Sequence, residues 1–331
     1  MPEGHSIRRL ATAFQEGFLD QRLQVSSPQG RFASGASEIN NHVLVASRAK
    51  GKHLFLGFAP SLDTDAGQWR WLHIHLGLYG AWTFAGDEEF HGPHAIGAPR
   101  VRIAETETAV RADAADLVWQ AQQAQHEAES GEWEPLPPRG AVRVRLLSEH
   151  GVADLTGPTR CEVIDTTELA AVEKRLGPDP LLPDPDGSQR AAFIAAVRAS
   201  RVTAGALLMD QSVLAGVGNI YRAELLYRAK VHPLRPGASL SARKVGAIWD
   251  DAVALMADGV APADVYTVLA TPEGQQRAFD KLATIKDDIV WFDSWSQAPQ
   301  LLNDGGAVLV QSANGRFYDA IRQENKPFVI V

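Results

Sequence analysis

A run rich in proline, aspartate and glycine at residues 182–188 divides the chain into two stretches with different hydrophobic periodicity. Before this run, apolar residues alternate with polar ones in short segments, which is typical of half-buried β-strands. After it, apolar residues recur at intervals of three and four, which is typical of α-helices. The sequence therefore predicts an α+β fold in two parts, with the linker at residues 182–188.

The first part reads as a β-sandwich that follows an N-terminal helix. Ser6 is the expected cap of this helix, which runs to Phe18 with its apolar positions at intervals of three and four. Strands are expected at residues 43–45, 53–58, 69–75, 82–84, 141–147 and 152–155. The second part reads as helices at residues 190–199, 204–209, 219–229 and 242–257.

The tail turns strand-like again from residue 287. An Asn314-Gly315 pair stands between two short strand patterns, and such a pair is a strong β-hairpin signal. We therefore predict three domains: a β-sandwich at 1–181, a helical domain at 182–286, and a hairpin at 287–331. An acidic insertion at 85–140, with a predicted helix at 105–130, interrupts the sandwich.

Composition limits the compartment and the cofactors that we expect. The 331 residues contain no apolar run long enough to cross a membrane and no leader pattern, so we expect a cytoplasmic protein. The single Cys161 excludes an internal disulfide and any zinc site built from several cysteines. We expect no cofactor and a monomer.

The net charge of −8 argues against a nucleic-acid ligand, but its distribution does not. Residues 1–84 carry a net charge of +2, residues 85–140 carry −7, and residues 141–331 carry −3. Most of the negative charge therefore lies in the insertion, and basic clusters elsewhere can still contact phosphates.

The chain begins Met1-Pro2-Glu3, and removal of the methionine would leave a secondary amine beside a carboxylate. An α-amino group titrates near about 7.7–8.0, whereas a lysine titrates near about 10.4, so such an amine is a ready nucleophile at neutral pH. The alternative is that Met-Pro stands there by chance and that Glu3 interacts with the dipole of the following helix.

Three further segments occur in a fixed order with this start: residues 50–56 around Gly51-Lys52, residues 72–80 ending in a glycine-rich loop, and residues 207–221 with Gly216-Val217-Gly218-Asn219. Together they resemble the formamidopyrimidine-DNA glycosylase/endonuclease VIII family, whose members excise damaged bases and cleave the abasic sites that result. The resemblance covers residues 1–84 and 141–260 well and the tail in part. It implies damaged or abasic DNA as the partner and a location at the bacterial nucleoid. It also implies that the sandwich at 1–181 is the catalytic domain, that the helical domain at 182–286 binds DNA, and that the hairpin at 287–331 is finger-like.

The resemblance assigns the chemistry to three residues. Pro2 stands where the family has the amine that attacks C1′ of the nucleotide, and Glu3 stands where it has the carboxyl group that protonates the sugar ring. Lys52 matches a phosphate-binding lysine. Lys50 competes for that role, but Gly51-Lys52 directly precedes the apolar strand, as in the family pattern.

The resemblance also places the DNA contacts. Asn219 matches the asparagine at the start of the second helix of a helix–two-turn–helix motif, where its amide and backbone N–H groups of the helix start would bind one phosphate. Gly216 and Gly218 would let the chain approach that phosphate closely. Leu78 and Tyr79 lie in the loop that fills the gap left by an everted base, although they could instead be buried at the strand end. Arg316 matches the arginine at the tip of a finger hairpin, here without zinc, or is an ordinary surface arginine.

Some residues depart from the family pattern. His5 and Ser6 stand where relatives carry proline and glutamate, and an Arg-x-Phe wedge pair is missing near residues 158–161, which favours the endonuclease VIII branch. His73 and His75 read as polar core residues because further metal ligands are not evident. Two alternative functions stay open: a lesion-binding protein without catalysis, and a glycosylase for bulky or cross-linked bases.

Overall fold

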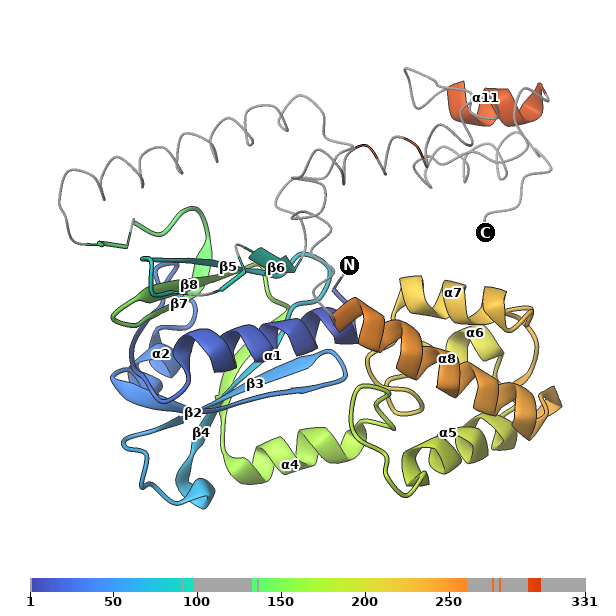
Figure 1. Cartoon of the computed structure of the whole chain (residues 1–331), viewed down its shortest axis with the longest axis horizontal. Coiled ribbons are helices and arrows are strands. Elements are labelled where there is room, and N and C mark those ends of the chain that lie inside the picture. Colours follow the sequence, from blue (N-terminus) through green and yellow to red (C-terminus); the bar gives the residue numbers. More distant parts are fainter. Residues whose placement is uncertain are drawn as a thin grey trace. The chain divides into compact units, whose positions relative to one another are not determined.

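The computed structural model describes residues 2–90, 92–93, 95–97, 133–135, 137–260, 276, 280 and 297–304. The chain divides into two compact units, Met1–Ala261 and Pro262–Val331. In the second unit the described residues include the helix α11 (Gln297–Asn303). The prediction that the tail is strand-like from residue 287 is therefore wrong at this segment. All further description concerns the first unit, which Figure 1 shows as a layered β part and a helical part.

The described β part contains nine strands that form two layers. The strands are β1 (Arg22–Ser26), β2 (His42–Lys50), β3 (His53–Ala59), β4 (Arg70–His75), β5 (Ala81–Gly86), β6 (Ala95–Gly97), β7 (Val142–Leu147), β8 (Gly151–Thr156) and β9 (Arg160–Ile164). Their order is β6-β5-β8-β7-β1-β2-β3-β4-β9, and all pairs are antiparallel. Because β1 pairs with β2 in one layer and with β7 in the other, it joins the two layers.

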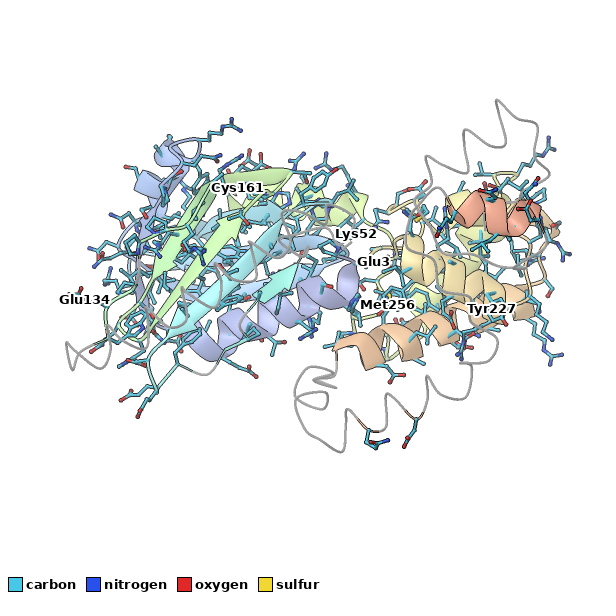
Figure 2. All side chains as sticks on the ribbon, turned by 90° about the horizontal axis from the view of Figure 1, so that it is seen from above. Glu3, Lys52, Glu134, Cys161, Tyr227 and Met256 are labelled. Carbon is cyan, nitrogen blue, oxygen red and sulfur yellow. The ribbon has the colours of Figure 1, made fainter. Side chains whose placement is uncertain are left out.

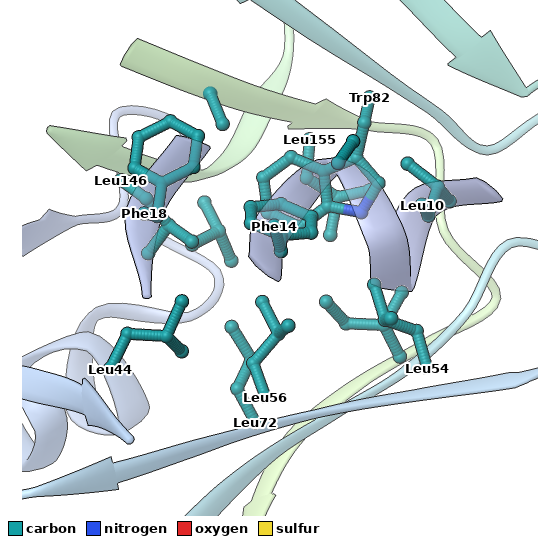
Figure 3. Packing of buried hydrophobic residues seen from close by; sticks show 14 of the residues in the cluster. Leu10, Phe14, Phe18, Leu44, Leu54, Leu56, Leu72, Trp82, Leu146 and Leu155 are labelled. Carbon is teal, nitrogen blue, oxygen red and sulfur yellow. The ribbon is translucent and has the colours of Figure 1, made fainter. Parts of the chain in front are cut away.

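The N-terminal helix α1 (Gly4–Phe18) fills the space between the layers. Figure 3 shows its Leu10, Phe14 and Phe18 packed against leucines of one layer and against Trp82 of the other. All five predicted apolar positions of this helix, including Ile7, are buried. Its core face is therefore the one that the periodicity predicts.

The predicted N-cap of α1, Ser6, was wrong by three residues, because the N-cap is Glu3. Ser6 lies inside the helix, because its N–H and that of Ile7 donate to the carbonyl oxygen of Glu3 at 2.9 and 3.3 Å. The Ser6 hydroxyl lies 3.1 Å from Nε2 of His5 instead of capping the helix. The helix begins at Gly4 because a tertiary contact fixes that residue: its N–H donates to the Gly216 carbonyl oxygen at 2.8 Å.

The helical part has its own hydrophobic cluster, which runs from Phe193 to Met256. Its helices are α5 (Ser188–Ala199), α6 (Ala204–Leu207), α7 (Asn219–Arg228) and α8 (Ala242–Val260). They occupy the four positions that the sequence predicts. The turns between α6 and α7 complete the helix–two-turn–helix motif, and the α+β class is confirmed.

Two further helices were not predicted. The helix α2 (Ala33–Ile39) follows β1, and α4 (Thr166–Arg175) follows β9. Residues Leu169 and Val172 of α4 pack with Phe55 and Trp71 on the face of the β2–β4 layer opposite α1. No helix among the described residues is both long and apolar enough to cross a membrane.

Candidate active site

The Pro2-Glu3 pair lies where the β part meets the helical part. Both residues are buried, and the Glu3 side chain is 0% exposed. Figure 2 shows Glu3 and Lys52 near each other at this junction, with Met256 of α8 close by. The fold thus brings together two of the predicted chemical residues, which are 49 positions apart in the chain.

The Glu3 carboxylate accepts three backbone hydrogen bonds at the start of α7. Oε2 accepts the N–H of Gly218 at 2.8 Å and that of Tyr221 at 3.3 Å, and Oε1 accepts the N–H of Ile220 at 2.8 Å. A helix leaves its first N–H groups without partners inside the helix, and a negative charge is stabilised there. Glu3 therefore interacts with the start of α7, not with the start of its own helix, for which it makes no side-chain cap.

Two glycines make this contact possible. A Cβ atom on Gly218 would lie 2.6 Å from Cδ of Glu3, so a larger residue would displace the carboxylate. Gly216 has a φ of +89°, and its Cα would lie 2.9 Å from a Cβ on Gly4. We predicted that these glycines let the chain approach a phosphate. In the structure they admit Glu3 and the start of α1.

Lys52 follows a tight turn that a buried carboxylate holds in place. Gly51, at a φ of +57°, donates its N–H to Oδ2 of Asp179 at 2.7 Å. Burial raises the pKa of Asp179, against the opposing effect of its backbone hydrogen bonds from Gly51 and Leu181. Burial also lowers the pKa of the half-buried Lys52, and the negative charge of Glu3 partly opposes that shift.

The two candidate lysines have different surroundings. Lys50 donates from Nζ to the Glu173 carbonyl oxygen at 3.0 Å, so it holds the C-terminal end of α4 to the sheet. Lys52 instead interacts electrostatically with Glu3 and with His75. Of the two, Lys52 has the surroundings expected for a site residue.

The loop between β4 and β5 presents both of its predicted DNA contacts to solvent. Leu78 is 54% exposed and Tyr79 is 60% exposed, so the alternative of two buried strand-end residues does not hold. A Cβ on Gly77 would lie 2.2 Å from Thr159, and one on Gly157 would lie 2.8 Å from the Tyr79 carbonyl oxygen. The loop is thus closely packed at its base while its apolar tip is exposed.

Asn219 is the first residue of α7 and is exposed. We predicted that its amide and the backbone N–H groups of the helix start bind one phosphate together. The N–H groups of Gly218, Ile220 and Tyr221 already donate to Glu3. A phosphate at this helix end would therefore depend on Asn219 itself.

The histidines that the sequence singled out lie in the sheet. His73 is 0% exposed and His75 is half-buried at the end of β4. Among the described residues, no group of three or more histidine, cysteine, aspartate or glutamate side chains could hold a metal ion. The described part of the chain therefore gives no support to a metal site at these histidines.

Some predictions lie outside the described residues. They are Arg316, the hairpin around residues 314–315, and the helix at 105–130 in the acidic insertion.

Sequence reasoning also missed residues that shape the site. Asp179 holds the Gly51 turn, and Gln211 accepts the N–H of Gly216 at 3.0 Å. Their polar side chains carry no signal in sequence that would tell them from ordinary loop residues.

Comparison with known proteins identifies the helical part and the fold. A family profile described as the formamidopyrimidine-DNA glycosylase H2TH domain matches residues 176–268. The solved complex of the Lactococcus lactis enzyme with DNA containing an abasic site superimposes with a TM-score of 0.54 at 16% identity, over 78% of each chain. The fold is therefore that of the formamidopyrimidine-DNA glycosylases.

A curated relative extends this similarity to most of the chain. Endonuclease 8 1 of Mycobacterium tuberculosis strain H37Rv is 38% identical over 268 residues, which are 81% of this chain and 80% of the relative. The formamidopyrimidine-DNA glycosylase of Herpetosiphon aurantiacus is 42% identical over 94 residues, 28% of this chain and 32% of that protein. The chain belongs to the formamidopyrimidine-DNA glycosylase/endonuclease VIII family of base-excision-repair DNA glycosylases.

The tail is similar to a different family. A profile described as bacterial extracellular solute-binding protein matches residues 239–331. The gamma-aminobutyric acid-binding protein of Pseudomonas aeruginosa is 44% identical over 85 residues, which are 26% of this chain and 24% of that protein. The predicted finger at 287–331 thus lies in a segment that has a second interpretation, as part of a solute-binding fold.

Proposed function

We propose that this protein is a bifunctional DNA glycosylase and abasic-site lyase that acts through the amine of Pro2 after Met1 has been removed. The amine attacks C1′ of an everted nucleotide, the damaged base leaves with the electrons of its glycosidic bond, and the sugar ring opens to an iminium. The iminium acidifies C2′, so loss of a C2′ proton expels the 3′ phosphate by β-elimination. Water then releases the product from Pro2.

The observation that carries this proposal is the placement of Glu3. A carboxylate offers about four lone pairs. Oε2 uses two of them for Gly218 and Tyr221, and among the described residues Oε1 uses one, for Ile220. One lone pair of Oε1 is thus left for a proton. We propose that Glu3 carries the proton that opens the sugar ring through this oxygen, directly beside the Pro2 amine.

The remaining residues bind DNA in this proposal. Lys52 neutralises a phosphate next to the everted nucleotide, and the Asn219 amide binds a second one. Leu78 and Tyr79 fill the gap in the base stack, which offsets part of the few kcal/mol that eversion costs. Their exposure supports this role, because a wedge must reach the DNA.

The family branch suggests the substrate. Two features favour oxidised pyrimidines as the damaged bases: the similarity to an endonuclease 8 over most of the chain, and the absence of an Arg-x-Phe wedge pair near residues 158–161. We propose that the protein acts as a monomer. The similarity of the tail to a solute-binding protein covers about a quarter of that relative and gives no second function here.

Borohydride trapping tests the proposal. Reduction in the presence of a DNA strand with an abasic site should give a covalent adduct whose peptide map places the link on Pro2. Pro2→Gly should keep part of this trapping, because a primary amine remains, while chemical blocking of the terminus should remove it. An adduct on a lysine would refute the role of Pro2, and binding without any adduct would favour a lesion-binding protein.

A further inference from the structure

Three histidines line one face of the β3–β4–β9 segment, and the first of them, His53, directly follows Lys52 in the chain. In the antiparallel register His53 lies opposite His75, and His73 lies opposite Glu162 on β9. His75 in turn lies opposite Arg160. Residues that alternate along neighbouring strands share a face, so these side chains form a short polar ladder.

A chain of hydrogen bonds runs along this ladder. An Arg160 nitrogen donates to Oε1 of Glu162 at 2.7 Å. The same Glu162 oxygen lies 3.1 Å from Nδ1 of His73. On the other side of the His73 ring, Nε2 lies 2.8 Å from Nδ1 of His53. Four side chains from three strands are thus linked from the exposed edge to the residue that follows Lys52.

The chemistry of these groups fixes which atom donates and which accepts in each hydrogen bond. Burial tends to raise the pKa of Glu162, but the hydrogen bonds and charges of Arg160 and His73 hold that pKa below its usual value, so the carboxylate only accepts. Nδ1 of His73 must then carry a proton. A neutral imidazole has one N–H, so Nε2 of His73 accepts and Nδ1 of His53 donates. The Nε2 atom of His53 is left with a bare lone pair.

The surroundings keep both rings neutral. Burial lowers the pKa of His53 to about 3, with further lowering by His73, His75, Arg160 and Arg175. Burial lowers the pKa of His73 to about 4, although Glu162 opposes this shift. At neutral pH neither imidazole therefore adds a positive charge next to the lysine.

His75 connects this chain of hydrogen bonds to the candidate site. The ring centroids of His53 and His75 lie 5.0 Å apart in an edge-to-face arrangement, and the charge of Lys52 acts on His75. Nδ1 of His75 accepts the N–H of Gly77 at 3.1 Å, at the start of the loop that carries Leu78. The ladder thus supports both the lysine turn and the base of the exposed loop.

We propose that Glu162 and His73 are positioning residues. They hold the His53 ring, which directly follows Lys52 in the chain, as an uncharged hydrogen-bond acceptor packed against His75, so that the turn carrying Lys52 meets the DNA phosphate in one fixed arrangement. The inference rests on the phosphate-binding role of Lys52 under the proposed function. It adds a relay, the hydrogen-bonded set of Arg160, Glu162, His73 and His53, which begins at the outer strand β9 and ends at the residue after Lys52.

Nitrogen-15 spectra of histidine-labelled full-length protein test the relay directly. In the parent protein at pH 7, His53 and His73 should both show a protonated Nδ1 and a bare Nε2, with peaks assigned by replacing each ring in turn. Glu162→Met removes the acceptor and should mix the two tautomers of both rings. Glu162→Gln should preserve them, because its carbonyl oxygen can still accept from His73.

Affinity for DNA with a stable abasic-site analogue tests the link to Lys52. Glu162→Met should bind about fivefold more weakly at pH 7, which is the factor for one hydrogen bond of about 1 kcal/mol, and Glu162→Gln should recover most of the affinity. Glu38→Met is the matched control. Glu38 also pairs with an arginine of the same sheet, Arg70, and its side chain is 47% exposed against 43% for Glu162.

The outcomes test separately whether the relay exists and whether it affects DNA binding through Lys52. A proton on Nε2 of His53 in the parent protein overturns the relay. Mixed tautomers in Glu162→Met with unchanged affinity, or an equal loss in Glu38→Met, overturn its positioning role. A parent protein that neither binds nor traps abasic DNA refutes the proposed function and with it the link to Lys52, while the spectra still decide whether the relay exists.

Discussion

The buried and the exposed residues of the candidate site differ in how firmly the fold holds them. Glu3 is 0% exposed and makes three backbone hydrogen bonds, while the turn before Lys52 is tied to the buried Asp179. Leu78, by contrast, is 54% exposed at a loop tip. Glu3 and the turn before Lys52 are therefore part of the core of the fold, whereas the proposed wedge residue Leu78 is added at its surface.

This difference predicts how substitutions in the two groups should affect stability, activity and DNA binding. A change in the buried group should lower both stability and activity, since it leaves polar atoms without partners. A change in the exposed group should lower DNA binding and leave the free energy of unfolding nearly the same. Each of the following substitutions tests that contrast.

Glu3→Gln should have the largest effect. The amide nitrogen would face the N–H donors of Gly218 and Tyr221 in one orientation and that of Ile220 in the other. Because an amide also cannot supply the proton, base excision should fall by about a hundredfold or more. Stability should fall by about 1–3 kcal/mol, since buried donors lose a partner. Single-turnover excision and denaturant unfolding measure the two effects, with Glu16→Gln on the exposed face of α1 as the control.

Gly218→Ala sharpens this test because it leaves the carboxylate intact. The added Cβ would lie 2.6 Å from Cδ of Glu3, so the carboxylate must shift, and excision and stability should fall together. Gly67→Ala is the matched control, since its new Cβ would meet the end of the Asp65 side chain. Full activity in Gly218→Ala would contradict the proposed position of Glu3.

Lys52→Ala should have an intermediate effect, with weaker binding to abasic-site DNA and a salt dependence that flattens by about one unit of slope. Burial lowers the pKa of Lys52, so its charge is lost at a lower pH than that of an exposed lysine. Binding should therefore decline in the alkaline range earlier than in Lys52→Arg. Titrations from neutral to alkaline pH measure this, with the exposed Lys174→Ala as the control.

Leu78→Ala should lower DNA binding and leave unfolding unchanged. The loss should be a few-fold and should be confined to DNA with an everted or missing base, because the side chain fills the gap in the stack. Leu62→Ala is a fair control, as Leu62 is 58% exposed in another loop. A clear loss of stability in Leu78→Ala would break the contrast between the two groups.

Arg316→Ala should have the smallest effect. If the tail is a finger, Arg316→Ala should weaken DNA binding. The tail from residue 239, however, matches a solute-binding family, so we expect Arg316 to contribute little to DNA binding. Binding and abasic-site cleavage by the full chain should then remain within about twofold of the parent. A loss as large as that of Lys52→Ala would support the finger.

The sequence alone determined the fold class, the four helices of the helical part and the buried face of α1. These features depend on local periodicity, which a single sequence shows directly. It missed α4, although Asp165 and Glu168 form a capping box there, as the hydrogen bonds between them confirm. It also missed β9, where exposed and half-buried residues do not alternate.

The tertiary structure decided how the site is held together. The Pro-Glu start, the Gly-Lys turn and the segment around Asn219 were visible in the sequence as separate motifs. That Glu3 binds the start of α7, that Asp179 fixes the Gly51 turn, and that His73 links Glu162 to His53 could not be read from it. Local pattern reports which face of an element is buried, whereas the partner of a buried polar atom depends on contacts between residues far apart in the chain.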